Sequence, residues 1–351
     1  MKFLNEIMKS EAYSLNDNKI SFQRYINQLT VYHYKRSNLY KKFLNSLKYK
    51  PNNDYQIHEL PFLPVRSFKQ FDLLSVNKRD IYKTLHSSGT TSNLLSKIYL
   101  DKANALNQIN VLKKIFFKTV VENKLPMIII DKKNNFDQNS YNATIAAIRG
   151  FSIFANDIVY LLDQNNNINY QELNKFLSKN KNRFIIFGLT SNIYLNLIEK
   201  IDKNKIDKKK FENSILIHGG GWKKILDKKL NHNDFNSLLS KNFGIQRVIN
   251  YYGLVEQIGS IFFECKCGYF IPSNFSDIII RDENLKVCET GEKGMVQLLS
   301  LLPTSYPGHS ILTEDIGEII NDEKCRCYGD GKRFIIHGRL KSAEIRGCSN
   351  V

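Results

Sequence analysis

The stretch Ser214-Ile215-Leu216-Ile217-His218-Gly219-Gly220-Gly221 decides the fold class, because a short apolar run passes directly into three glycines. Three comparable runs precede it at residues 126–131, 158–162 and 183–188, and each is followed by polar or glycine residues. Polar, helix-like stretches separate the runs, and this alternation is typical of a parallel sheet with helices on both faces. Ligands of such sheets bind at the carboxyl ends of the strands, so the three glycines mark a candidate binding site.

The flanking regions have different patterns. Residues 1–50 carry aromatic and apolar residues at helical spacing, and the prolines at 51, 61 and 64 end that pattern. After about residue 260 the pattern changes to short strands separated by turns. The predicted strands are residues 260–264, 277–281, 295–302, 317–320 and 333–338. We therefore expect four parts: an N-terminal helical segment (1–50), an α/β core (51–258), a β-rich subdomain (259–338) and a short C-terminal tail (339–351).

The composition excludes several classes of protein. Of the 351 residues, 42% are hydrophobic, which is enough for a substantial buried core. The chain has no run of about 18 apolar residues and no apolar signal segment after Met1, so we expect no transmembrane span and a cytoplasmic location. The net charge is +17, but the lysines are scattered among asparagines, as on a solvated surface. We therefore expect no nucleic-acid partner.

The segment Ser87-Ser88-Gly89-Thr90-Thr91-Ser92 is a candidate phosphate-binding loop. Small residues around a glycine allow backbone N–H groups to converge on an anion, and the hydroxyl groups add further donors. Lys97 follows the segment and adds a positive charge. An ordinary Ser/Thr turn explains the same residues, and the segment alone does not decide between the two interpretations.

Further candidate ligand-binding segments follow in order. The glycines at 219–221 allow close approach of the backbone to a flat or anionic ligand, although a tight turn requires the same residues. Within residues 251–257, an aromatic ring is available to stack on a base, and Glu256 is available to bind Mg²⁺. Asp315 ends a strand-like run and is suited to bind two ribose hydroxyl groups. Residues 337–341 are expected on a turn.

In this order the segments resemble those of the adenylate-forming superfamily, which joins a carboxylate to AMP. Within that superfamily the chain is most similar to the LuxE-like acyl-protein synthetases. The resemblance covers roughly residues 55–351 and is carried by residues 60–65, 87–91, 187–191, 218–224, 306–315 and 343–348.

The resemblance implies a fold of stacked αβαβα-type sheets with a β-rich subdomain, and a reaction in two steps. An acyl carboxylate attacks the α-phosphorus of ATP with release of pyrophosphate, and a thiol then takes the acyl group as a thioester. It also implies roles for individual residues: phosphate binding by Ser87, Ser88, Gly89, Thr90, Thr91 and Lys97; Mg²⁺ binding by Glu256; adenine binding by Gly219, Gly220, Gly221, Tyr252 and Gly253; ribose binding by Asp315; and ribose or phosphate binding by Arg339.

The chain departs from the pattern of the superfamily at several points. Ser92 replaces a glycine and Val255 replaces a threonine that is common before the glutamate, so we expect slower turnover. The mobile C-terminal domain with a catalytic lysine that ordinary ligases carry is absent from the sequence, as it is in acyl-protein synthetases. Those enzymes accept the acyl group on a cysteine near the C-terminus, and Cys348 matches that position. An incidental tail cysteine is the alternative.

Two Cys-x-Cys pairs form a separate feature, Cys265 with Cys267 and Cys325 with Cys327. Four thiolates meeting in a tetrahedron are suited to structural Zn²⁺, and phenylacetate-type ligases also carry cysteines in this region. Free or buried thiols explain the pairs as well, so both interpretations stay open. Cys288 has no obvious partner, and His218 and His309 are predicted to be structural rather than catalytic.

The sequence therefore leads to three hypotheses. The first is an enzyme that uses ATP and Mg²⁺ to activate a carboxylic acid, with fatty acids among the candidates, and transfers it to a protein thiol such as its own Cys348. The second is a ligase that delivers the acyl group to coenzyme A, a carrier protein or an amine. The third is a non-catalytic nucleotide-binding subunit of a complex. An acyl-accepting partner, such as a reductase, a transferase or a carrier protein, would fit the first two.

Overall fold

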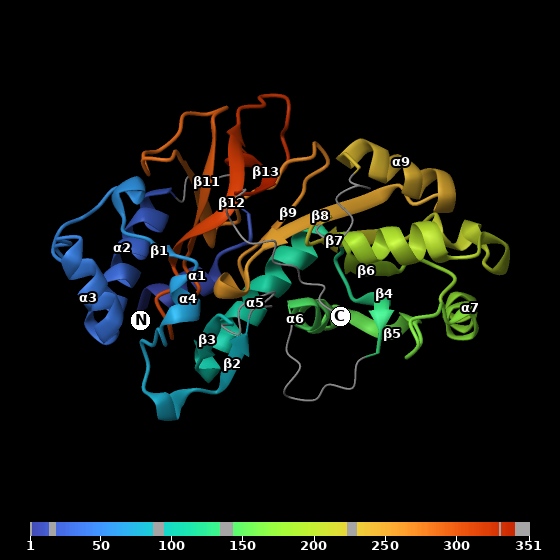
Figure 1. Cartoon of the computed structure of the whole chain (residues 1–351), viewed down its shortest axis with the longest axis horizontal. Coiled ribbons are helices and arrows are strands. Elements are labelled where there is room, and N and C mark those ends of the chain that lie inside the picture. The colour runs from blue at the N-terminus through green and yellow to red at the C-terminus, as the bar shows by residue number, and fades with distance from the viewer. Residues whose placement is uncertain are drawn as a thin grey trace. The chain divides into compact units, whose positions relative to one another are not determined.

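The computed structural model describes residues 2–13, 19–86, 95–133, 143–222, 230–329 and 331–340. The chain forms two compact units, here called unit 1 (Met1–Val120 and Gly253–Glu344) and unit 2 (Val121–Tyr252 and Ile345–Val351). Figure 1 labels the elements of both units. The border at Tyr252 lies close to the predicted boundary at residue 258. The structure divides the predicted core 51–258 at Val120 and groups the N-terminal part with the β-rich part.

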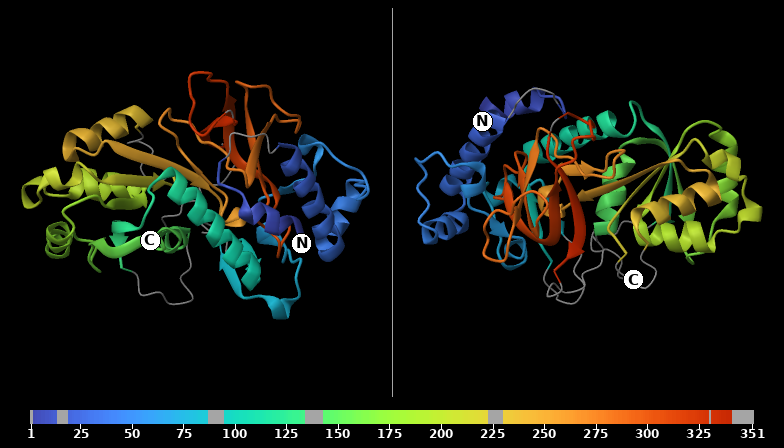
Figure 2. Two further views of the ribbon diagram at one scale, coloured as in Figure 1. Left: turned by 180° about the vertical axis from the view of Figure 1, so that it is seen from behind. Right: turned by 90° about the horizontal axis from the view of Figure 1, so that it is seen from above.

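Unit 2 is built on a parallel sheet with the strand order β5-β4-β6-β7-β8. The four runs predicted as buried strands are confirmed, and Figure 2 shows the strands from above. The structure adds β8, which the sequence reading missed because its residues mix aromatic and polar side chains without a clear apolar run. The strands are β4 (Leu125–Lys132), β5 (Ala155–Leu162), β6 (Ile185–Leu189), β7 (Ile215–Gly219) and β8 (Arg247–Gly253).

Helices cover both faces of this sheet because side chains of successive strand residues point to opposite sides. Ile186 and Leu216 pack in one core cluster with side chains of four helical elements, α7, η3, η5 and α9, whereas Phe187 stacks on Phe151 of α6 with ring centroids 4.3 Å apart. Every residue of β6 and β7 is buried, as expected for the centre of a parallel sheet. The helical elements are α6 (Ala143–Ser152), α7 (Tyr170–Lys179), α8 (Thr190–Asn192), η3 (Ile193–Lys200), η4 (Lys203–Lys205), η5 (Lys208–Phe211) and α9 (His232–Phe243).

Unit 1 contains a second, mostly antiparallel sheet in the order β1-β12-β11-β10, with β13 paired to β12. The short strand β1 pairs with β12 in parallel, which draws the N-terminal part of the chain into the same unit. A separate two-stranded ribbon is formed by β2 and β3. The strands are β1 (Leu63–Pro64), β2 (Lys83–His86), β3 (Lys97–Leu100), β9 (Ile261–Phe263), β10 (Ser276–Arg281), β11 (Lys293–Ser300), β12 (Ser310–Ile320) and β13 (Arg333–Arg339).

The helices of unit 1 come mainly from the N-terminal part, and α1, α2 and α3 lie within the predicted helical segment 1–50. Two buried histidines tie α2 to the segment that precedes β12: His309 Nε2 lies 3.0 Å from Thr30 Oγ1, and His33 Nε2 lies 3.1 Å from the carbonyl oxygen of Pro303. The helical elements are α1 (Lys2–Lys9), α2 (Lys19–Arg36), α3 (Asn38–Ser46), η1 (Ile57–Glu59), α4 (Ser67–Gln70), η2 (Lys78–Asp80), α5 (Lys102–Thr119) and η7 (Val255–Gln257).

Two local predictions in this unit were wrong. The run before Asp315 does not end there, because β12 continues to Ile320, and His337 to Arg339 lie in β13 rather than on a turn. The pairing of β12 with β13 shifts register between Ile316 and Gly317, and Gly338 adopts φ +137°. A bulge of this kind inserts one residue into a strand, so glycine there marks an irregular strand and not a turn.

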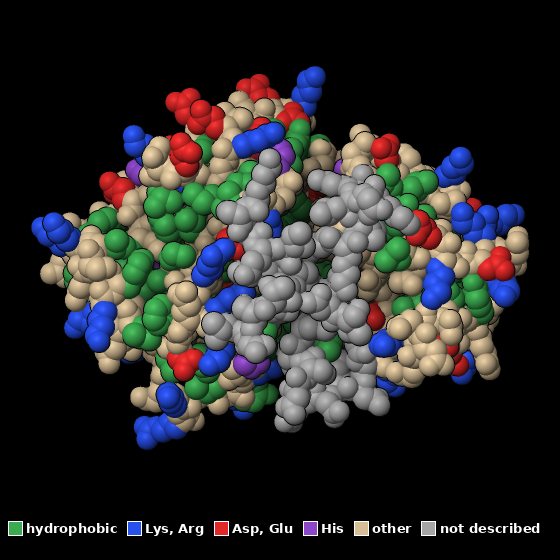
Figure 3. Space-filling view, in the orientation of Figure 1, with side chains coloured by type: hydrophobic (Ala, Val, Ile, Leu, Met, Phe, Trp, Pro, Cys, Tyr) green, Lys and Arg blue, Asp and Glu red, His purple; other side chains and the backbone are tan. Residues whose placement is uncertain are grey.

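The distribution of charged side chains on the face shown in Figure 3 agrees with the prediction that the lysines are scattered over a solvated surface. On the face shown in Figure 3, Lys and Arg side chains are scattered and lie among acidic and neutral ones. Among the described helices, none combines the length and the apolarity that crossing a membrane requires. The fold is mixed α/β with several sheets and a β-rich part, which confirms the predicted class.

Candidate functional site

Several residues of the predicted site lie outside the described part of the chain. They are the phosphate-loop residues Ser87, Ser88, Gly89, Thr90, Thr91 and Ser92, and the candidate acyl acceptor Cys348. The remaining candidates fall in both units. Unit 1 holds Lys97, Gly253, Glu256, Asp315 and Arg339, and unit 2 holds Gly219, Gly220, Gly221 and Tyr252.

In unit 1, Glu256 is a buried carboxylate on a short 3-10 helix, with 5% of its surface exposed. The segment around it is fixed by two hydrogen bonds from buried side chains. The hydroxyl group of Tyr306 donates to the carbonyl oxygen of Glu256 at 2.9 Å, and Gln257 Nε2 donates to the carbonyl oxygen of Gly308 at 2.8 Å. A side chain at Gly308 would meet the same carbonyl of Glu256 at 2.9 Å, so glycine allows this close approach. The backbone that carries Glu256 is therefore held in a defined place.

Burial raises the pKa of Glu256, and a hydrogen bond from Ser96 together with the positive charges of Lys69 and Arg339 acts in the opposite direction. A buried carboxylate that loses its hydration gains from a nearby cation. Carboxylate oxygen is also the ligand type that Mg²⁺ uses beside phosphate groups. The chemistry of this side chain thus fits the predicted metal-binding role.

Asp315 and Arg339 lie opposite each other on β12 and β13, and Arg339 Nε donates to Asp315 Oδ1 at 3.2 Å. Asp315 is largely buried, and its backbone N–H donates to Thr313 Oγ1 at 3.1 Å. On the neighbouring position of β12, Glu314 forms an ion pair with Arg66. The structure therefore joins two of the predicted nucleotide-binding residues, and Arg339 connects them to Glu256 through its charge.

Lys97 has a partner that the sequence did not suggest. Its ammonium group lies 3.4 Å from Asp72 Oδ1, on the surface of unit 1. The hydroxyl group of Tyr99 donates to the same Asp72 oxygen at 2.6 Å. Within the described part of the chain Lys97 thus contacts a carboxylate, and its expected role beside a phosphate group stays a prediction.

In unit 2, three glycines follow one another at the end of β7, and glycine is required at these positions for different physical reasons. A side chain at Gly219 would lie 2.7 Å from the ring of Tyr251 and 2.8 Å from its carbonyl oxygen, so the ring needs this glycine. Gly220 and Gly221 adopt φ +83° and +70°, in the left-handed region that favours glycine. Among the described residues, which omit 223–229, no atom lies within 4 Å of the position that a Gly221 side chain would take. Close packing therefore requires the first glycine, and backbone shape requires the other two.

The adjacent strand β8 ends in two tyrosines on opposite faces of the sheet. Tyr251 packs on Phe151 with ring centroids 4.9 Å apart and stacks on Phe187 at 6.2 Å. Tyr252, the tyrosine predicted to bind adenine, is half-buried on the other face, and the exposed Gly253 follows it. Both tyrosines are half-buried: Tyr251 packs against aromatic rings beside the glycine turn, and Tyr252 stays the predicted adenine-binding residue.

Thr190 follows the last residue of β6, and His218 precedes the last residue of β7, beside the glycine turn. Thr190 Oγ1 lies 2.9 Å from His218 Nδ1, and the same hydroxyl group lies 3.0 Å from the carbonyl oxygen of Gly219. Burial lowers the pKa of His218 to about 3, so the ring is neutral at ordinary pH. This agrees with the structural role that the sequence predicted for His218.

Sequence reasoning missed Ser96, Lys69 and Arg66, which stand outside any motif and come to the site through pairing of distant segments. Thr190 could have been found, because it lies in the segment 187–191 that carries part of the resemblance to acyl-protein synthetases.

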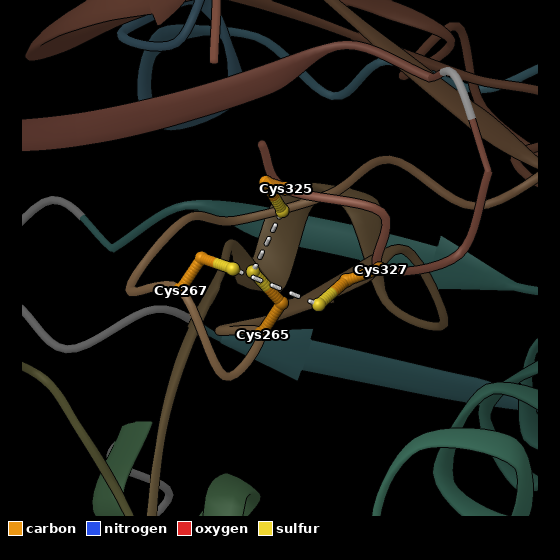
Figure 4. Close-up of side chains that lie close together, drawn as sticks. All are labelled: Cys265, Cys267, Cys325 and Cys327. Carbon is orange, nitrogen blue, oxygen red and sulfur yellow. Dashed lines mark hydrogen bonds between the residues drawn. The ribbon is translucent and has the colours of Figure 1, made fainter. Parts of the chain in front are cut away.

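A second cluster in unit 1 consists of the four thiol groups of Cys265, Cys267, Cys325 and Cys327, whose sulfur atoms all lie within 4.8 Å of one another. Figure 4 shows the four side chains directed toward a common point. The structure therefore brings together the two Cys-x-Cys pairs that the sequence placed far apart. Cys288 is not part of this cluster.

Known proteins with similar sequences are fatty-acid ligases. The chain is 24% identical over 349 residues to the long-chain-fatty-acid–luciferin-component ligase of Aliivibrio fischeri, which covers 97% of this chain and 90% of that protein. It is 30% identical over 139 residues to the enzyme of the same name from Vibrio harveyi, which covers 38% of this chain and 35% of that protein.

The fold is that of an adenylate-forming ligase. A crystal structure of 2-hydroxyisobutyryl-CoA ligase in complex with 2-HIB-AMP superposes with a TM-score of 0.71 at 14% identity, and covers 94% of this chain and 69% of that one. Residues 5–351 match the family described as acyl-protein synthetase, LuxE. The chain is therefore an enzyme of the adenylate-forming superfamily and belongs to the LuxE family of acyl-protein synthetases.

Proposed function

We propose that this enzyme activates a long-chain fatty acid with ATP and Mg²⁺ and transfers the acyl group to a protein thiol. The observation that carries the proposal is the arrangement of Glu256, Asp315 and Arg339 in unit 1. Arg339 donates to Asp315 at 3.2 Å and also acts through its charge on the buried Glu256. The long-chain acid is suggested by the name of the Aliivibrio fischeri relative, which matches nearly the whole chain.

In the first step, an oxygen of the fatty-acid carboxylate forms a bond to the α-phosphorus of ATP, and the bond from that phosphorus to the β-phosphate oxygen breaks. Pyrophosphate leaves with the displaced electron pair. Little covalent chemistry is required of the protein, so positioning and neutralisation of negative charge provide most of the acceleration. Glu256 would hold Mg²⁺ beside the phosphate groups, and the positive charge of Arg339 would face the ribose or the α-phosphate.

The binding of the nucleoside follows from the polar groups that each unit presents. Asp315, held by Thr313 and Arg339, would accept hydrogen bonds from the ribose hydroxyl groups. In unit 2, the space beside Gly221 and the half-buried ring of Tyr252 suit a flat base. The loop at Ser87 to Thr91 remains the proposed phosphate-binding segment, with Lys97 beside it.

In the second step, a thiolate sulfur would attack the acyl carbon of the adenylate, and the bond from that carbon to the phosphate oxygen would break with release of AMP. The thiol proton passes to solvent. Cys348 is the proposed acceptor because it matches the position of the acceptor cysteine in the family. A protein that later takes the acyl group from this thioester, such as a reductase, a transferase or a carrier protein, would be its partner.

The test is to incubate the full chain with ATP, Mg²⁺ and fatty acids of different length, and to measure pyrophosphate release and intact protein mass. We expect pyrophosphate release and a mass increase equal to the mass of the fatty acid minus one water. Cys348→Ser should keep pyrophosphate release and lose the mass increase, whereas Cys288→Ser, the matched control, should keep both.

Other outcomes would change the proposal in defined ways. Pyrophosphate release without an adduct in the unmodified chain would show an external acceptor, and adding coenzyme A, a carrier protein or an amine would then identify its class. An adduct that persists in Cys348→Ser would move the acceptor to another residue. Absence of pyrophosphate release with every acid tested would contradict the proposed reaction itself.

A further inference from the structure

The four-cysteine cluster of unit 1 stands apart from the proposed reaction and joins two loops that are distant in sequence. Cys265 and Cys267 lie between β9 and β10, and Cys325 and Cys327 lie between β12 and β13. Across the two loops, the sulfur atoms of Cys265 and Cys325 lie 3.8 Å apart, and those of Cys267 and Cys327 lie 4.0 Å apart. Each sulfur of one loop thus has a close partner on the other.

These distances agree with the edges of a metal-centred tetrahedron. A zinc–sulfur bond of about 2.3 Å in tetrahedral geometry places neighbouring sulfur atoms about 3.8 Å apart. Two sulfur atoms of a disulfide would lie about 2.05 Å apart. The spacing across the loops, 3.8 and 4.0 Å, therefore corresponds to four thiolates around one ion and not to two disulfides.

The two loops also have the same local shape. Gly268 directly follows Cys267 and adopts φ +84°, and Tyr328 directly follows Cys327 and adopts φ +58°. Both loops therefore turn through a left-handed residue at the same place after the second cysteine. Glycine adopts this conformation without strain, whereas in tyrosine the Cβ atom makes it unfavourable. The strained tyrosine indicates that the second loop is held in its shape by the contacts around it.

Ordinary apolar burial does not explain why the thiols converge. A free cysteine is usually buried as a small apolar side chain. Cys265 and Cys325 are buried, but Cys267 is exposed and Cys327 is only half-buried. The exposed pair is nevertheless turned toward the other two sulfur atoms (Figure 4). A shared ligand accounts for this orientation, because it needs all four sulfur atoms whatever their exposure.

The surroundings suit a cluster with excess negative charge, since four thiolates around Zn²⁺ carry a net charge of −2. Lys266 and Arg326 are the middle residues of the two Cys-x-Cys pairs. The guanidinium group of Arg333 donates to the carbonyl oxygens of Cys325 at 2.5 Å and Gly329 at 2.7 Å, and so fixes the second loop. The positive charge of Arg333 beside the second loop favours the charged form of the cluster.

The N-terminal segment packs on the same cluster. Tyr13 stacks on Tyr328 with ring centroids 4.6 Å apart, and both rings contact the buried cysteines. Asn274 anchors the segment through two hydrogen bonds of 2.9 Å. Its backbone N–H donates to the carbonyl oxygen of Ala12, and its side-chain amide donates to the backbone carbonyl oxygen of Glu11. Lys114 adds bonds to the carbonyl oxygens of Met8 and Ser10. The cluster thus lies where three distant parts of unit 1 meet.

We propose that Cys265, Cys267, Cys325 and Cys327 bind one structural Zn²⁺ that fastens the β9–β10 and β12–β13 loops and supports the N-terminal segment at Tyr13. Binding releases the four thiol protons, and no oxidation or reduction takes place. All four coordination positions are filled by protein sulfur, which is typical of a structural site and leaves no open position for catalysis.

The test measures metal and not activity, so it is independent of the proposed reaction. The full chain, purified without chelators under reducing conditions, should contain about one zinc per chain by elemental analysis, as a four-thiolate site requires. Replacement by Co²⁺ should give the intense thiolate-to-cobalt and d–d absorption bands of a tetrahedral sulfur site. Zinc-free protein in the presence of Zn²⁺ should regain a higher melting temperature and stronger protection of residues 265–270 from hydrogen exchange.

Variants locate the site on the predicted ligands. Cys267→Ser should bind zinc at least about 100-fold more weakly, because even the loss of a residue that only supports a ligand costs 10–100-fold. Cys267 is exposed, so this change leaves no cavity, and Cys288→Ser is the matched control that should keep full zinc. Any of three results would overturn the proposal. They are a wild-type protein that contains no zinc, a Cys267→Ser variant that keeps its full zinc content, and an intact mass that shows two disulfides.

Discussion

Two strand pairs, β6 with β7 in unit 2 and β12 with β13 in unit 1, present candidate ligand-binding groups in different ways. At the end of β7 the groups are consecutive glycines, so backbone shape makes the site. On β12 and β13 the groups are Asp315 and Arg339, which only strand pairing brings within 3.2 Å. A site made by backbone shape should respond to added methyl groups, and a site made by paired charges should respond to changes of charge.

The largest effect is expected from the buried carboxylate of unit 1. Glu256→Gln should reduce pyrophosphate release about 10²–10³-fold, the range seen when one group that stabilises transition-state charge is removed. The melting temperature should not fall, because burial raises the pKa of Glu256 and the charged form is the costly one. Glu318→Gln on β12 is the control. Equal loss of stability and activity would show that Glu256 serves the fold instead.

Acid should weaken both units through their buried histidines. Burial lowers the pKa of His33 in unit 1 and of His218 in unit 2 to about 3, whereas the unfolded chain titrates near 6.5. The unfolded state therefore binds more protons between these values. Stability should be fully present above pH 6.5 and fall by about 1.4 kcal/mol per pH unit for each histidine as the pH drops toward 3.

Denaturant titrations from pH 7.5 to 5 measure this slope, and the variants His33→Asn and His218→Asn assign it to the units. Each should reduce the slope by the part that one histidine contributes. A slope that is the same in the unsubstituted protein and in both variants would contradict the assignment to the buried rings.

Alanine substitutions in the glycine turn should distinguish the effect of side-chain packing from the effect of backbone conformation. Gly219→Ala forces a methyl group to 2.7 Å from the ring of Tyr251, so we expect a loss of about 1–3 kcal/mol in the free energy of unfolding. Gly221→Ala meets open space but keeps φ +70°, and it should cost about 1 kcal/mol. Gly150→Ala in α6 also meets open space and should stabilise by about 0.5–1 kcal/mol. Equal losses in the free energy of unfolding for Gly219→Ala and Gly221→Ala would contradict the assignment of packing to Gly219 and backbone conformation to Gly221.

The smallest effect on stability is expected at the charged pair of unit 1. Because Arg339 is partly exposed, Arg339→Met should change the free energy of unfolding by no more than about 1 kcal/mol. Its KM for ATP should nevertheless rise about tenfold, since a charged hydrogen bond contributes about 1.5 kcal/mol. Arg339→Lys should restore stability more than it restores KM, because lysine cannot reproduce the geometry of the guanidinium group. An unchanged KM in Arg339→Met would remove Arg339 from the nucleotide site.

Local patterns predicted the parallel sheet well. The runs at β4, β5, β6 and β7 are rich in isoleucine and are bounded by polar or glycine residues, so neighbours in sequence suffice to recognise them. The same reasoning failed where an irregular pairing decides the conformation. It placed residues 337–341 on a turn because Gly338 reads as a turn residue, whereas pairing with β12 extends the strand to Arg339.

The sequence by itself determined the family, the α/β class and the types of chemical group that the candidate site contains. Only the tertiary structure decided which of those groups meet. Asp315 joins Arg339 and the two pairs of cysteines join each other across 60 positions of sequence, while Tyr251 rather than Tyr252 fills the space beside Gly219. The physical reason is that propensity and periodicity act between residues a few positions apart. Contacts at a site depend instead on how distant segments pair and pack.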